Sequence, residues 1–125
     1  MPIQGGGMEI IIMNVEQFYA SIGSDAAEVI RRLGGSPALV ERFLMKFRED
    51  GSFSELNTAL AAGDTDVAFR AAHTLKGVCA TLGLGRLLAQ ASSVTELLRD
   101  GNLEDAKQAF PALASEYELV IKALD

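Results

Sequence analysis

The chain has 125 residues, of which 49% are hydrophobic and 22% charged, which fits one globular domain and disfavours a disordered chain. Its 11 Lys and Arg residues against 17 Asp and Glu residues leave a formal net charge of −6, which disfavours binding to nucleic acid or to an anionic membrane surface. One cysteine and one histidine exclude an internal disulfide, a cysteine-rich zinc site and any metal site that needs two imidazoles.

Residues 1–13 are predicted to be a leader outside the fold. They include three consecutive glycines, and Met8 is a candidate natural start. The apolar run Ile10–Met13 is far shorter than the roughly 20 residues that a membrane-spanning helix needs. No signal-peptide pattern opens the chain. We therefore expect a cytoplasmic, monomeric protein whose single domain covers residues 14–124.

From residue 14 onward the apolar residues recur at helical spacing, and no stretch alternates with the period of a strand. This pattern predicts two short helices: the first begins at Asn14 or Glu16 and ends at Ile22, and the second begins at Ser24 or Asp25 and ends at Leu33. Gly34-Gly35 ends the second, because glycine readily adopts the left-handed conformation found at helix ends. Ser36-Pro37 then opens a new helix with a capping hydroxyl and a proline at the first helical position.

Four longer helical units follow, and each ends close to a glycine or at the chain end. The first is expected to break at Gly51, where the sequence SFSE at residues 52–55 resembles a capping box. The last contains Pro111 inside its apolar pattern, which predicts one kinked helix or two coaxial pieces. Apolar stripes on helices joined by short turns must pack against one another. We predict an all-α fold, an antiparallel four-helix bundle capped by the short N-terminal helices, with its long units at 37–62, 64–82, 84–100 and 102–124.

His73 lies in the middle of the predicted helix 64–82. On a helical wheel, Ala68, Ala71, Leu75 and Leu82 share one side, and His73 points almost directly away from them. The wheel therefore disfavours a buried histidine and predicts an imidazole that faces solvent, either by chance or for a function.

The residues one turn away favour a function. Lys76 and Gly77 follow His73 by three and four positions, and Arg70 precedes it by three, so all lie on the same face. A glycine inside a helix costs roughly 0.8–1 kcal/mol relative to alanine, and at this outward position it would let a partner approach the imidazole closely. Lys76 would add a positive charge beside the ring.

An exposed imidazole with a cation next to it can act as a nucleophile. A phosphoryl group on its nitrogen would carry negative charge that Lys76 could offset. No phosphate-binding loop of the GxxxxGK[ST] type is present, so the sequence predicts no ATP site. The phosphoryl group would have to come from another protein.

The sequence AAHTLKGVCATLG at residues 71–83 closely resembles the active-helix motif of histidine phosphotransfer (HPt) domains. That motif has a His-x-Leu-Lys-Gly core and a glycine six residues beyond it. The family's usual layout is similar to this chain from about residue 14 to residue 124. Together with an all-helical domain of this length, the resemblance is specific.

The resemblance implies a phosphocarrier in a multistep two-component phosphorelay. His73 would accept a phosphoryl group from an aspartyl phosphate on one receiver domain and pass it to the aspartate of another. Lys76 would help to position the phosphoryl group and Gly77 would keep the site open. The receiver would bring magnesium, so this chain would need no metal or other cofactor.

The chain departs from the family pattern just after Gly77. Many members carry small polar residues there and an asparagine before the closing pair of a hydrophobic residue and a glycine, whereas this chain has Val78, Cys79 and Thr81. A hydrogen bond from such polar residues to the imidazole is therefore in doubt. Cys79 itself is expected to be a small buried side chain and not a redox group.

Four other functions are rivals to the phosphocarrier. The phosphoacceptor helix of a histidine kinase usually has an acid directly after the histidine and a proline five residues on, but Thr74 and Val78 occupy these places. The phosphorylatable domain of a chemotaxis-type kinase is itself an HPt bundle and remains open. A non-catalytic helical adaptor is disfavoured because His73, Lys76 and Gly77 are all present, and no motif supports a hydrolase.

A docking surface for the receiver is expected around the histidine. Phe69 lies four residues before His73, on the outward face, where an exposed apolar side chain suggests a binding surface. Arg70 and Lys76 would make this surface locally positive, to match an acidic receiver pocket. We predict that one patch is formed by Phe69, Arg70, His73, Lys76, Gly77 and Ala80.

Overall fold

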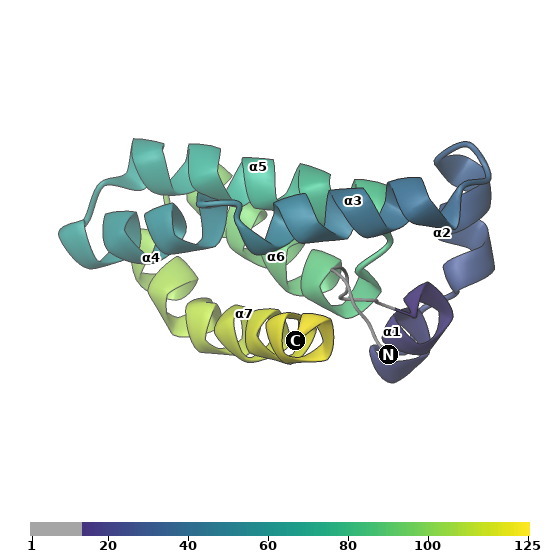
Figure 1. The fold of residues 1–125 in the computed structure, drawn as a ribbon. Coiled ribbons are helices and arrows are strands. Elements are labelled where there is room, and N and C mark those ends of the chain that lie inside the picture. Colours follow the sequence, from purple (N-terminus) through teal and green to yellow (C-terminus); the bar gives the residue numbers. More distant parts are fainter. Residues whose placement is uncertain (1–13) are drawn as a thin grey trace.

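The computed structural model describes residues 14–125, and all their regular elements are helices. The leader predicted at residues 1–13 lies outside the described residues. Two short helices open the fold and five longer ones follow (Figure 1). Their bounds are α1 Val15–Ser21, α2 Ala26–Arg32, α3 Pro37–Arg48, α4 Ser52–Ala62, α5 Thr65–Leu82, α6 Gly85–Arg99 and α7 Leu103–Leu124.

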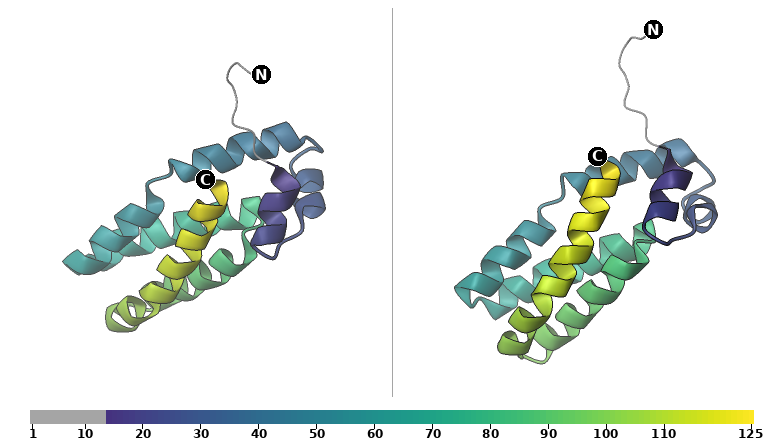
Figure 2. Two further views of the ribbon diagram at one scale, coloured as in Figure 1. Left: turned by 60° about the horizontal axis from the view of Figure 1, so that its bottom comes forward. Right: turned by 90° about the horizontal axis from the view of Figure 1, so that it is seen from below.

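The predicted antiparallel four-helix bundle is confirmed. α5 packs along both α4 and α6, and α6 packs along α7, so each helix lies against its neighbour in the chain. α7 returns to touch α3 and α4, which together form the first, broken helix of the bundle (Figure 2). The shared core includes Leu44, Leu56, Leu75, Val94 and Leu113, all buried.

Side chains start most helices where the sequence predicts. Asn14, Asp25, Ser36 and Asp64 each accept a hydrogen bond from a backbone N–H in the first turn of the following helix. The capping box expected at residues 52–55 is wrong.

Ser52 is already the first residue of α4, and it is buried among core side chains. The Asp50 carboxylate accepts the N–H of Ser52 over 2.8 Å instead. An acidic residue two positions earlier thus replaces the predicted serine cap.

α7 continues as one helix across Pro111, so the expected alternative of two separate pieces is wrong. Proline removes one backbone donor, but the core-facing Ala106, Leu113 and Val120 keep their spacing on both sides of it. Burial of this stripe holds the helix together.

α1 and α2 cover the end of the bundle at which α5 terminates (Figure 1). The buried Tyr19 hydroxyl donates to the carbonyl of Leu82 over 2.6 Å. Arg32 donates to the carbonyls of Ala80 and Thr81 over 3.1 and 3.0 Å. These bonds satisfy carbonyls that the last turn of a helix leaves free, so the capping helices fix the end of α5.

Gly83 closes α5 in the left-handed conformation, with φ of 66°. A Cβ at this position would lie 2.5 Å from Cγ2 of Val29 on α2. Both the backbone angle and the close approach of α2 therefore require glycine here.

Candidate functional site

His73 lies in the middle of α5, and its side chain is exposed. The opposite side of the helix is anchored in the core by Ala68, Ala72, Leu75 and Cys79, all buried. Within residues 14–125 the imidazole makes no hydrogen bond to the protein, so its nitrogens are open to a visiting group. The outward histidine expected from the helical wheel is confirmed.

The flank of His73 on the α6 side is occupied by an aromatic ring and a guanidinium. The rings of Phe69 and His73 are stacked, with centroids 5.9 Å apart and planes 15° apart. The guanidinium of Arg99, at the end of α6, lies 5.1 Å from the centroid of the Phe69 ring, within cation–π range. Phe69 therefore lies between a fixed cation and the imidazole.

Two ion pairs meet on one carboxylate of α6 beside this stack. Lys76 Nζ lies 3.9 Å from Glu96 Oε2, and Arg99 Nε donates to Glu96 Oε1 over 3.2 Å. The side chains of Lys76 and Glu96 are 33% and 55% exposed, so water competes for their pairing. Lys76 is thus close to His73 along the helix but is held from the side by Glu96.

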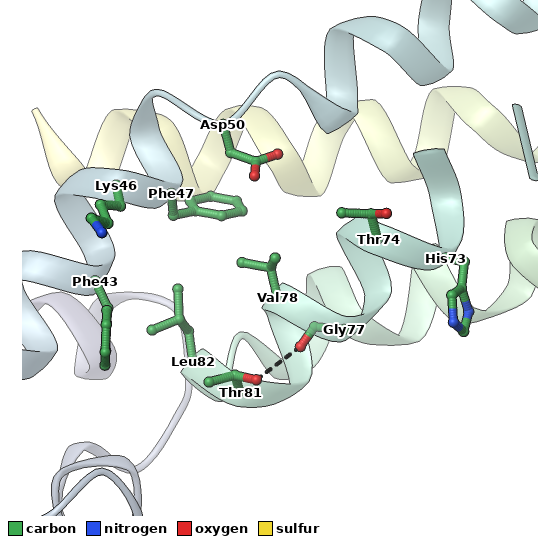
Figure 3. A pocket seen from close by; sticks show the side chains of 10 residues that line it. All are labelled: Phe43, Lys46, Phe47, Asp50, His73, Thr74, Gly77, Val78, Thr81 and Leu82. Carbon is green, nitrogen blue, oxygen red and sulfur yellow. Dashed lines mark hydrogen bonds between the residues drawn. The ribbon is translucent and has the colours of Figure 1, made fainter. Parts of the chain in front are cut away.

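The flank of His73 on the α3 side is open. Gly77 lies one turn after His73, and a Cβ at Gly77 would meet no atom within 4 Å. From there a groove of about 590 Å³ runs between α3 and α5 (Figure 3). Aromatic and aliphatic side chains dominate its walls, with one basic and one acidic group; the lining residues are Phe43, Lys46, Phe47, Asp50, His73, Thr74, Gly77, Val78, Thr81 and Leu82.

The predicted docking residues are distributed unevenly around the histidine. Arg70, Gly77 and Ala80 are exposed, as expected. Phe69 is not the exposed apolar side chain that the sequence predicts: it is half-buried, because its ring packs against the core and lies under Arg99. Because the Phe69 ring stacks on His73, it supports the imidazole and is only partly accessible to a partner.

Glu96, Arg99 and the α3 wall of the groove are not predicted from the sequence. Glu96 and Arg99 are three residues apart with opposite charges, on either side of the buried Leu98. This spacing indicates that both lie at the edge of the core stripe, where they can reach the next helix. The half-buried Phe43 gives no comparable signal, since its spacing is that of a core residue.

The three residues that depart from the family pattern do not contact the imidazole. Val78 points into the groove, and the Thr81 hydroxyl donates to the Gly77 carbonyl over 3.0 Å (Figure 3). Cys79 is fully buried, and this burial, followed by the charge of Asp50, raises the pKa of its thiol to about 12. The thiol is therefore neutral at physiological pH, as expected for a packing residue.

Elsewhere on the described surface few features point to a ligand. Residues 14–125 contain no cluster of three or more His, Cys, Asp or Glu side chains that could hold a metal ion. None of the helices in this range is long and apolar enough to cross a membrane. Among the large hydrophobic side chains described, Leu119 on α7 is exposed, at 48%.

Comparison with known proteins agrees with this geometry. Residues 38–123 match the family described as Hpt domain, and the match covers α5 and all of the groove residues. Neither the curated proteins nor the solved structures gave a match. Hpt domains act as phosphotransfer carriers in phosphorelays and not as ATP-using enzymes, and they interact with receiver domains. With an exposed histidine on a helical bundle and a family match over most of its length, this chain belongs to the Hpt domain family.

Proposed function

We propose that this protein is a phosphohistidine carrier without an ATP site of its own. His73 accepts a phosphoryl group from a receiver-domain aspartate, or from a kinase, and passes it to the aspartate of a response regulator. The observation that carries this proposal is the exposed His73 with Lys76 and Gly77 one turn away and an open groove beside them. A non-catalytic adaptor would have no need of this combination.

The transfer step follows from the exposed, unpaired imidazole. The lone pair of a ring nitrogen attacks the phosphorus of the aspartyl phosphate, and the bond from phosphorus to the aspartyl oxygen breaks. The electron pair of that bond stays on the departing carboxylate, and the proton on the other ring nitrogen can leave to water. Lys76 offsets the charge of the bound phosphoryl group.

The receiver docks over Gly77 and into the groove between α3 and α5. The absence of a side chain at Gly77 lets the receiver's active site reach the imidazole. The apolar walls from Phe43, Phe47 and Val78 provide contact area for an apolar surface of the receiver. Arg70, exposed beside His73, offers a positive charge to the acidic pocket that holds the receiver's aspartate.

We propose that the functional domain spans residues 14–124, more than the matched residues 38–123. α1 buries Val15, Phe18 and Tyr19. The bonds from Tyr19 and Arg32 to the last carbonyls of α5 connect the capping helices to the helix that carries His73. The same domain could serve within a chemotaxis-type kinase, since the phosphoacceptor chemistry would be identical.

Incubation with a receiver domain that carries labelled phosphate tests the proposal. The wild-type protein should take up label that is lost in acid, as expected for a phosphoramidate, and His73→Gln should take up none. Circular dichroism should show the same helicity in both proteins, because His73 contributes no core contact.

An acid-stable label, or a labelled His73→Gln protein, would place the phosphoryl group on a serine or threonine and contradict the assignment. If His73 carries the label, profiling against the organism's full set of receiver domains would identify the donor and the acceptor. Transfer to no receiver at all would favour the adaptor.

A further inference from the structure

Two cations near His73, Lys76 and Arg99, share one counter-ion, Glu96. Lys76 Nζ lies 3.9 Å from one oxygen of its carboxylate, and Arg99 Nε lies 3.2 Å from the other. Arg99 also covers the Phe69 ring that stacks on the imidazole. Two side chains that flank the phosphoacceptor are therefore tied to a single carboxylate on the neighbouring helix.

The balance of charges around His73 changes once the imidazole carries a phosphoryl group. The phosphoryl oxygens are strong hydrogen-bond acceptors with close to two negative charges. They compete with the Glu96 carboxylate for Lys76. The Lys76–Glu96 pair is long and partly solvated, so it can open without leaving a buried charge unpaired.

We propose that Glu96 is a positioning residue that weakens the phosphorylated state. This inference rests on the proposed phosphocarrier function. In the unmodified protein Glu96 holds Lys76 beside His73 and Arg99 over the Phe69 ring. In the phosphorylated protein it competes with the phosphoryl group for Lys76, which favours onward transfer to the next receiver.

The expected size follows from the exposure of the pair. Exposed ion pairs change an equilibrium by a factor of about 1.5 to 5. Glu96→Gln keeps the size of the side chain and one acceptor oxygen but removes its charge. It should shift the phosphoryl equilibrium toward phosphohistidine by about two- to fivefold at low salt.

The experiment measures the equilibrium constant for phosphoryl exchange between a labelled receiver domain and the full chain, at low and high salt. Glu104→Gln is the matched control, since Glu104 also pairs with a lysine. Its partner is Lys107 on the same helix, at 3.7 Å. Glu96→Gln should shift the constant at low salt, the shift should shrink at high salt, and Glu104→Gln should match the wild type.

The Lys76→Ala variant distinguishes the proposed role of Glu96 from a merely structural one. In the Lys76→Ala background the effect of Glu96→Gln should largely disappear, because the competition for Lys76 no longer exists. An unchanged equilibrium in Glu96→Gln, or an equal shift in both backgrounds, would overturn the inference and leave the phosphocarrier function intact. If wild-type His73 takes up no label, the proposed function fails, and the inference fails with it.

Discussion

The two flanks of His73 consist of different kinds of side chain. On the α3 side there is a groove of about 590 Å³ with mainly apolar walls. On the α6 side Phe69, Arg99, Lys76 and Glu96 form a connected group of stacked rings and ion pairs. The first flank has room for another molecule, and the second is already filled by the protein's own side chains.

This difference indicates a division of labour around one imidazole. An open apolar groove can supply contact area to a partner, which affects binding. A charged, filled flank can orient the ring and set the electrostatic environment of a phosphoryl group, which affects the transfer step. Substitutions on the two flanks should therefore change different kinetic constants.

Lys76→Ala should have the largest effect among the neighbours of His73. Loss of a charged hydrogen-bond donor to the phosphoryl group should slow transfer by roughly ten- to a hundredfold. The change should leave helicity intact, because Lys76 is partly exposed and paired loosely. Rapid-quench measurement of label transfer checks this, with Lys107→Ala on α7 as the control.

Gly77→Ala should separate stability from function. A methyl group here meets no atom within 4 Å, so the variant should be more stable by up to about 1 kcal/mol, the usual gain over glycine inside a helix. The same methyl group occupies the space through which the receiver reaches the imidazole, so transfer should slow by about tenfold.

Thermal melts and transfer rates measured on the same samples test this. Gly85→Ala in α6 is the control, since its Cβ would meet only Ser24 Oγ, at 3.9 Å. A Gly77→Ala protein that transfers at the wild-type rate would show that the receiver does not approach over this position.

Phe43→Ala and Phe69→Ala should separate the two flanks, with smaller effects of about three- to fivefold. Phe43 lines the groove, so its loss should raise KM for the receiver and leave kcat unchanged. Phe69 stacks on His73, so its loss should lower kcat. Saturation kinetics with a phosphorylated receiver separates the two constants, and Leu119→Ala, at an exposed apolar position on α7, is the control.

Arg70→Ala extends this test to the exposed face. It should raise KM and reduce the salt dependence of docking, because Arg70 is an exposed cation beside the site. Wild-type rates in both Phe69→Ala and Arg70→Ala would contradict the docking patch. Equal changes of KM in Phe43→Ala and Phe69→Ala would contradict the division between the flanks.

Much of the fold could be predicted from the sequence because its signals are local. Apolar spacing, capping side chains and glycine stops are read within one helix, and they located α5 and the outward direction of His73. The predicted cap of α4 is wrong because Asp50 and Ser52, two residues apart, can both accept a hydrogen bond from the start of the helix. The Asp50 carboxylate is the one that does so. Core packing carries α7 past Pro111, and this depends on contacts with other helices.

The surroundings of His73 were harder to predict because they depend on contacts between helices. A helical wheel shows that Phe69 shares a face with His73, but not that Arg99 of α6 covers it. In the same way, Phe43 has the spacing of a core residue, yet α3 touches α5 only sparingly and leaves a groove there. Positions on one helix can be read from sequence, whereas the gap between two helices cannot.

The bonds from Tyr19 and Arg32 to the carbonyls at the end of α5 have a consequence for how the protein can be shortened. A chain that begins at residue 36 would keep the family match but leave these acceptors to water. Amide exchange in the last turn of α5 would then accelerate, while the amides near His73 would keep more of their protection. The N-terminal helices thus limit fraying at the end of the helix that bears the phosphoacceptor.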